Sequence, residues 1–154
     1  MNAITFLLLF LLLPNANAQT VHFCGRQHSP KTAIIVHCFD SEVTSLKPVA
    51  KITNVYRLSL RGTGIRDVKP LRNLKRLFYI VITKSQVTDI TPLANVKSLG
   101  GLVLEDVPVT DVLATVLKLP NLMLLSLIRT KVPPSQIKKL KKLRPKLEVE
   151  FQQY

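Results

Sequence analysis

A single apolar pattern recurs about every 22 residues between Val55 and Val132, and it constrains the fold more than any other feature of the chain. Because copies begin at Val55, Leu77, Leu99 and Leu122, the steps between them are 22, 22 and 23 residues. A unit of this length cannot bury its own apolar side, so the copies must stack on one another. Each copy holds two apolar residues spaced two apart, as one face of a short strand requires: Leu58 and Leu60, Ile80 and Ile82, Leu102 and Leu104, Leu125 and Leu127.

The pattern resembles the leucine-rich repeat, L-x-x-L-x-L-x-x-[N/T]-x-[I/L]. A second segment, I-x-D-x-x-P-L, is similar to the internalin-type bacterial subfamily. It is present as Ile65-Asp67-Pro70-Leu71 and as Val87-Asp89-Pro92-Leu93, and where the family places Asn after the strand this chain has Thr63, Ser85, Val107 and Thr130. The resemblance implies an α/β leucine-rich-repeat solenoid, with short parallel strands on a concave face, short helices or turns on a convex face, and a cap at each end.

Residues 1–18 are typical of a secretory signal peptide. An apolar run from Phe6 to Leu13 precedes the small-x-small sequence Ala16-Asn17-Ala18. The run is much shorter than the ~20 residues that span a bilayer, so an uncleaved anchor is the weaker alternative. We expect cleavage before Gln19 and a secreted or periplasmic protein, which would keep the whole net charge of +13 because residues 1–18 are uncharged.

Residues 19–32 break the repeat, and the register returns at Ala33 as a degenerate first copy with Cys38 at an inward strand position. Two cysteines in an exported chain predict a disulfide between Cys24 and Cys38, which would tie this N-terminal cap segment to the first repeat. A metal site formed by the cysteines with His28 and His37 is the alternative. The two cysteines and the two histidines do not show the short C-x₂₋₄-C or H-x₃₋₅-H spacing of a zinc site, so we expect no metal. We expect no cofactor either.

The solenoid is expected to comprise about five repeats over residues 33–132, followed by a last convex helix and a cap strand over 133–154. Ser135 is the expected helix N-cap, with the basic side chains facing solvent and Pro145 ending the helix. Charged outward residues on the last strand would discourage edge pairing. The expected inward residues are Ile137, Leu140 and Leu143 on the helix and Leu147, Val149 and Phe151 on the strand, which alternate there with Glu148 and Glu150.

Asp67, Asp89 and Asp111 also recur every 22 residues. The recurrence is compatible with a calcium ladder or with acid–base chemistry. Each aspartate, however, lies at the start of a convex turn, where its carboxylate can accept hydrogen bonds from the first backbone N–H groups. We therefore predict a structural role for all three.

The residues between the buried strand positions are expected to point to the concave face. They include an aromatic residue, aliphatic residues, arginines and an acidic pair, a composition associated with protein contact surfaces. This composition predicts a protein-binding module whose partner the sequence does not name, and we expect the protein itself to be a monomer. The alternative is that Val81 and Val103 only favour strand formation. The candidate binding residues are Arg57, Ser59, Arg61, Tyr79, Val81, Thr83, Lys84, Val103 and Glu105.

A second candidate function follows from charge. With a pI near 10.2, the chain favours polyanions such as anionic lipid, lipopolysaccharide or glycan, and the C-terminal helix is the most basic segment. Nucleic acid is disfavoured because no recognition motif accompanies the charge. The candidate residues for this alternative are Lys138, Lys139, Lys141, Lys142, Arg144 and Lys146.

Catalysis is not expected from this sequence. All three histidines lie between His22 and His37, and no serine or cysteine occupies a nucleophile motif. Gly100-Gly101 lies within a strand unit and lacks the Lys and Ser/Thr of a phosphate loop.

Overall fold

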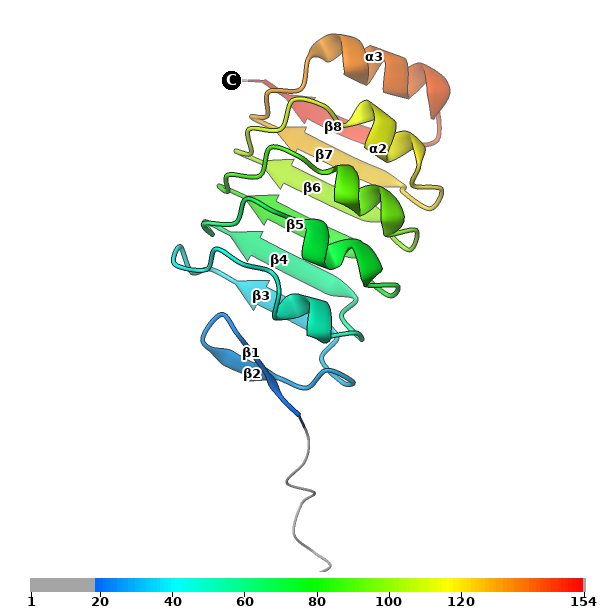
Figure 1. Cartoon of the computed structure of the whole chain (residues 1–154). Coiled ribbons are helices and arrows are strands. Elements are labelled where there is room, and N and C mark those ends of the chain that lie inside the picture. Colours follow the sequence, from blue (N-terminus) through cyan, green and yellow to red (C-terminus); the bar gives the residue numbers. More distant parts are fainter. Residues whose placement is uncertain (1–18, 154) are drawn as a thin grey trace, which may run out of the picture.

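The computed structural model describes residues 19–153, so the predicted signal peptide lies outside the described residues. Six parallel strands form one sheet and follow one another in chain order, which confirms the expected leucine-rich-repeat solenoid (Figure 1). Equivalent residues of successive repeats pair across the sheet; Leu58, for example, pairs with Ile80, and Ile80 with Leu102. The strands are β3 (Ile35–Cys38), β4 (Arg57–Arg61), β5 (Tyr79–Thr83), β6 (Gly101–Glu105), β7 (Leu124–Ile128) and β8 (Glu148–Gln152).

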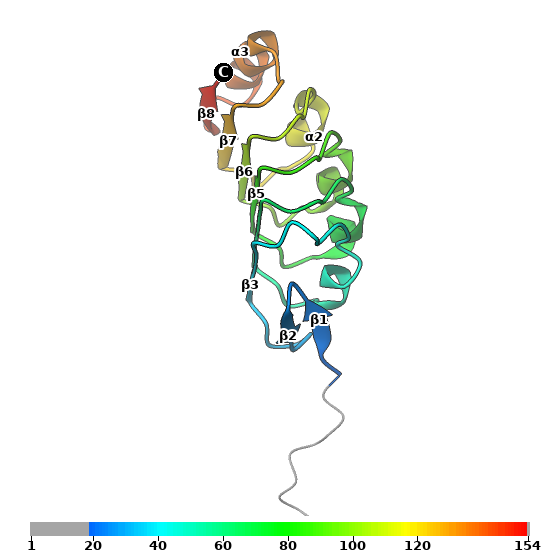
Figure 2. The same cartoon turned by 90° about the vertical axis from the view of Figure 1, so that its left-hand side faces the viewer.

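Short helical segments connect the strands and form a second layer behind the sheet (Figure 2). The earlier connections are 3-10 turns and the later ones are α-helices. Pro70 and Pro92 each lie within the first residues of a turn, where a missing N–H is tolerated. The connecting elements are η2 (Val49–Lys51), η3 (Lys69–Asn73), η4 (Thr91–Asn95), α2 (Leu113–Leu117) and α3 (Pro134–Leu143).

The core lies between the two layers. The inward strand residues Leu58 and Leu60 are fully buried, as are Ile65 and Leu71 from the connection that follows. Each such side chain contributes about 1.5–3 kcal/mol by leaving water. The same set of positions recurs in every repeat, so the core continues from β3 to β7 without a break.

The position that carries Asn in the family is also buried here. Ser85 accepts a 3.5 Å hydrogen bond from the N–H of Val87. The hydroxyls of Thr63 and Thr130, by contrast, have no hydrogen-bond partner within the part of the chain that the structure describes. The residues at this position of the repeats therefore stabilise the fold mainly by packing, and not by a row of side-chain hydrogen bonds from repeat to repeat.

The recurring aspartates occupy the structural role predicted for them. Asp67 accepts a hydrogen bond from the N–H of Lys69 at 2.8 Å, and Asp89 accepts one from Thr91 at 2.8 Å. Asp111 accepts one from Leu113 at 3.0 Å. Each carboxylate thus satisfies an N–H group at the start of a convex turn, which would otherwise lack a partner within the turn.

Replacing Asp89 with alanine is expected to lower the free energy of unfolding by about 1 kcal/mol, because the N–H of Thr91 loses its acceptor. Asp89→Asn keeps an oxygen at the same place and should cost much less. Urea denaturation of the two variants and the wild type measures both effects. If Ca²⁺ raised the midpoint of the wild type but not that of Asp89→Ala, the aspartates would hold a cation and the capping interpretation would be wrong.

A two-stranded antiparallel hairpin precedes the first repeat and covers its end (Figure 1). Its strands are β1 (Val21–Phe23) and β2 (Arg26–His28), joined by Cys24 and Gly25, both of which have positive φ. Two consecutive residues with positive φ match the right-handed twist of a tight hairpin. Val21 and Phe23 are buried against the core, and the predicted disulfide joins Cys24 to the fully buried Cys38. Neither sulfur is then available as a thiolate ligand for a metal.

The C-terminal cap has the predicted helix and strand, but three expectations about it are wrong. Ser135 lies inside α3, whose N-cap is Pro133. Leu143 does not face inward, because its side chain is 49% exposed at the end of the helix. Arg144 does not face solvent freely: its guanidinium donates to the carbonyls of Val116, Leu119 and Leu122 at 3.2, 3.0 and 2.9 Å. It therefore ties the cap to the preceding repeat.

Candidate functional site

The outward side of the six-stranded sheet brings the predicted binding residues together in rows across neighbouring strands. We call this side the concave surface. Its middle row contains the short side chains Ser59, Val81, Val103 and Ser126, which the register places side by side. The candidates Arg57 and Tyr79 lie in the row on one side, which Gly101 and Leu124 continue across the later strands. The candidates Arg61, Thr83 and Glu105 lie in the row on the other side, which Ile128 continues.

The middle of the concave surface is closed. Val81 is only 6% exposed, so the expectation that it is an exposed aliphatic contact is wrong. Ser59 in the same row is buried too, and so is Thr83 in a flanking row, whereas Val103 is half-buried. A residue there has a neighbouring strand on both sides, about 4.8 Å away, and the adjoining side chains cover it.

Exposed apolar area is found instead at the first strand. Ile35 is 55% exposed and Phe39 is 67% exposed. The ring of His37 stacks on that of Phe39, with 6.2 Å between centroids. Because β3 has a strand partner on one side of the six-stranded sheet only, its side chains are less covered than those of the central strands.

Tyr79 is held in place by its neighbours. The guanidinium carbon of Arg57 lies 4.6 Å from the centre of the Tyr79 ring, a cation–π arrangement. On its other side the ring occupies the space where Gly101 would carry a side chain, and Phe78 does the same at Gly100. The Gly100-Gly101 pair, which lacks the features of a phosphate loop, thus makes room for two aromatic rings.

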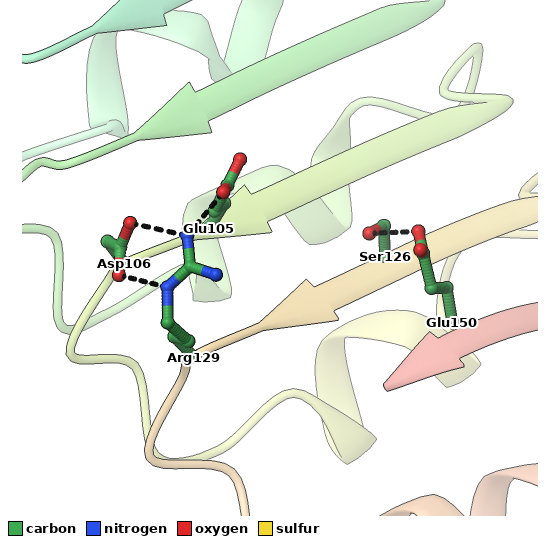
Figure 3. Close-up of polar contacts among 5 residues, drawn as sticks. All are labelled: Glu105, Asp106, Ser126, Arg129 and Glu150. Atoms are coloured by element: carbon green, nitrogen blue, oxygen red, sulfur yellow. Dashed lines mark hydrogen bonds and ion pairs between the residues drawn. The ribbon is translucent and has the colours of Figure 1, made fainter. Parts of the chain in front are cut away.

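Glu105 is paired inside the molecule. Arg129 donates two hydrogen bonds to Asp106, at 2.7 and 2.8 Å, and a further one to Glu105 (Figure 3). These hydrogen bonds, first those to Asp106 and then the one to Glu105, raise the pKa of Arg129 above its usual value. A second acidic side chain is also hydrogen-bonded within the molecule: the Ser126 hydroxyl on β7 donates to Glu150 on β8 at 2.7 Å (Figure 3).

Sequence reasoning missed the left-handed backbone at the strand ends. Lys84, Asp106 and Arg129 have φ of 49°, 52° and 49°, and Gly62 stands at the equivalent place in the earlier repeat with φ of 62°. Their N–H groups donate to the last carbonyl of the next strand, for example from Lys84 to Glu105 at 2.9 Å. Gly62 was the strongest available signal and Asp106 a weaker one, since positive φ disfavours most residues other than Gly, Asn and Asp. This geometry sets the three charged side chains along one rim of the concave surface.

A surface cavity of about 230 Å³ lies beside the disulfide, at the first strand. Its lining consists of Cys24, Arg26, His37, Phe39 and Asp40. It is smaller than the roughly 300–1,000 Å³ of typical small-molecule sites. Among residues 19–153, moreover, no group of three or more His, Cys, Asp or Glu side chains is placed to hold a metal ion.

The basic residues of the polyanion alternative lie elsewhere. Lys138, Lys139, Lys141 and Lys142 are exposed on α3, and Lys146 is exposed after it. Helix α3 belongs to the layer behind the sheet, at the C-terminal end (Figure 1). The structure therefore separates this charge from the concave surface and removes Arg144 from the set, because its guanidinium is already bonded to backbone carbonyls.

Several solved structures of internalins and other leucine-rich-repeat proteins are similar to this chain. Internalin C2 of Listeria monocytogenes is 26% identical with a TM-score of 0.63, over 77% of this chain and 50% of that protein. Internalin F of the same species is 21% identical with a TM-score of 0.57, over 75% and 40%. A leucine-rich-repeat protein of Leptospira interrogans is 24% identical with a TM-score of 0.67, over 75% and 30%. No protein-family model and no curated protein sequence matches the chain.

The chain has a leucine-rich-repeat fold similar to that of the internalins. It covers half or less of the length of the three similar structures. Leucine-rich-repeat proteins of this kind are typically non-enzymatic modules for protein–protein interaction. The disulfide and the internalin-like fold fit an extracellular protein. Within residues 19–153, no helix has both the length and the apolar character needed to cross a membrane.

Proposed function

We propose that this leucine-rich-repeat protein is exported and that it binds a protein partner through its concave surface. The observation that carries the proposal is the set of exposed, partly fixed side chains on that surface. Arg57 stacks on Tyr79, His37 stacks on Phe39, and Arg61 and Lys84 are exposed beside them. Aromatic and arginine side chains held in place before binding lose little entropy on contact, which favours them as interface anchors.

The face that binds can be tested with two variants that lower the net charge by the same amount. One places Phe39→Glu, Arg61→Glu and Ile128→Glu along the concave surface, at positions that are exposed or half-buried. The other places Lys138→Glu and Lys142→Glu on α3. In a pull-down from envelope and host extracts, we expect the wild type and the α3 variant to retain one discrete protein through a ~1 M salt wash, at which the Debye length is ~3 Å. The concave variant should lose it.

The same two variants also test the alternative function, which is polyanion binding through α3. That alternative is favoured by the exposure of all the α3 lysines on the layer opposite the concave surface. If the wild type instead captured lipid, lipopolysaccharide or glycan that salt releases, and only the α3 variant lost it, the basic cap would be the binding site. A protein partner that the folded concave variant retained would also contradict the proposal.

A further inference from the structure

We infer that the first three strands of the concave surface select an acidic polypeptide segment that carries an apolar side chain. This inference rests on the proposed function and names the class of partner for it. The surface is not uniform from one end to the other, and three observations locate the recognition site at β3, β4 and β5: the sign of the charge, the exposed apolar area and the cavity beside the disulfide.

Charge divides the concave surface into two halves. Arg57, Arg61 and Lys84 are exposed on β4 and at the ends of β4 and β5. Over the later strands, Arg129 is bonded to Glu105 and Asp106, and β8 presents Glu148 and Glu150. The first half is therefore positive and the second half negative. An acidic segment is attracted to the first half and repelled from the second, which places it over β3, β4 and β5.

Exposed apolar side chains coincide with the positive half. Ile35 and Phe39, at 55% and 67% exposure, lie on and just after β3, next to Arg57 and Arg61 on β4. A purely polyanionic ligand, such as a sulfated glycan, has no apolar group to cover these side chains. An acidic peptide with an aliphatic or aromatic residue can bury them while its carboxylates form paired hydrogen bonds with the arginines.

The cavity of about 230 Å³ beside the disulfide offers a place for one side chain of such a segment. Arg26 and His37 supply donors, and the Phe39 ring supplies an apolar wall. Asp40 also lines the cavity and would disfavour a carboxylate close to it, so the carboxylate is expected on the side of Arg26. Covalent attachment of Cys24 to Cys38 holds the Arg26 strand against β3, which keeps the cavity in shape before a partner arrives.

The test is panning of a random peptide display library on the oxidised full-length protein, followed by affinity measurement with the enriched peptides. We expect sequences that combine Asp or Glu with Phe, Leu or a similar apolar residue. Arg57→Glu with Arg61→Glu should raise the Kd of such a peptide by at least about tenfold, and Phe39→Ser should do the same. Glu148→Gln with Glu150→Gln, on the opposite half, should change the Kd by less than about twofold.

The outcomes separate this inference from the function on which it rests. Basic or uncharged peptides that bind the concave surface and are lost on Ile128→Glu would overturn the acidic class and leave concave binding standing. If only substitutions on α3 abolished peptide binding, both the acidic class of partner and binding through the concave surface would be wrong. Acidic peptides that bind the folded Arg57→Glu, Arg61→Glu variant unchanged would overturn the inference, as would an absence of any acidic enrichment. Equal affinity for heparin and for the acidic peptide would also overturn it, because the apolar contact would then contribute nothing.

Discussion

Reduction of the Cys24–Cys38 disulfide is expected to lower the free energy of unfolding by about 3 kcal/mol. The bond closes a loop with a sequence separation of 14, and a loop of about 15 residues corresponds to ~3 kcal/mol of chain entropy removed from the unfolded state. The loss of stability should be greatest at the N-terminal end, because the β1–β2 hairpin would no longer be covalently attached and an isolated two-stranded hairpin is only marginally stable in water. Without the bond, Val21 and Phe23 would cover the first repeat less persistently.

Urea denaturation of the wild-type protein with and without dithiothreitol measures this effect without a substitution. A Cys24→Ser, Cys38→Ala variant is the control, and alanine is used at position 38 because that site is fully buried and would not accommodate a hydroxyl without cost. Its midpoint should be low and should not respond to dithiothreitol. Hydrogen exchange should show faster opening of β3 than of β6 after reduction. Equal midpoints for oxidised and reduced wild type would show that the hairpin does not depend on the bond.

The repeat architecture could be predicted from the sequence because a solenoid uses the same contacts many times. Val55, Leu77, Leu99 and Leu122 start equivalent units, so each strand is specified by a local pattern and by its neighbours. Even the first repeat, with a cysteine at an inward position, was placed correctly by the 22-residue register. The aspartate turns followed from the same logic, since the capping hydrogen bond spans only two residues.

Exposure across the concave surface was harder to predict. The alternation of a strand shows which side a residue faces, but not what its neighbours on other strands cover. Val81 faces outward yet is 6% exposed, whereas Phe39 at the first strand is 67% exposed. The difference comes from position in the stack rather than from residue type. For this reason our proposal places the contact area at the first strand and not at the centre of the sheet, where the sequence predicted it.

Long-range hydrogen bonds were also outside the reach of the sequence pattern. Arg129 and Glu105 are separated by 24 residues, and Arg144 and Val116 by 28. In sequence, Arg144 is one more basic residue in a lysine-rich segment. In the structure it is the residue that joins the C-terminal cap to the convex layer.

Replacing Arg144 with alanine is expected to lower the free energy of unfolding by about 2 kcal/mol. Its guanidinium donates to three backbone carbonyls, those of Val116, Leu119 and Leu122, where α2 ends and the chain returns to the sheet. The carbonyls of Val116 and Leu119 also accept backbone hydrogen bonds, from the N–H groups of Leu119 and Leu122, so Arg144 supplies a second bond to each of them. Hydrogen bonds from a charged donor contribute roughly 1.5–3 kcal/mol each. The expected loss for all three bonds together is only about 2 kcal/mol, because Arg144 is half-buried and water can replace part of the interaction.

Two further variants separate the hydrogen bonds from the charge. Lys142→Ala removes an exposed positive charge from the same segment and should shift the urea midpoint very little. Arg144→Lys keeps the charge but loses the planar fork that reaches three acceptors at once, so it should recover less than half of the lost stability. If Arg144→Ala and Lys142→Ala had the same midpoint, Arg144 would contribute only charge. It would then belong with the lysines as part of the basic surface, and the C-terminal cap would have to be held by the burial of Ile137 and Leu140 alone.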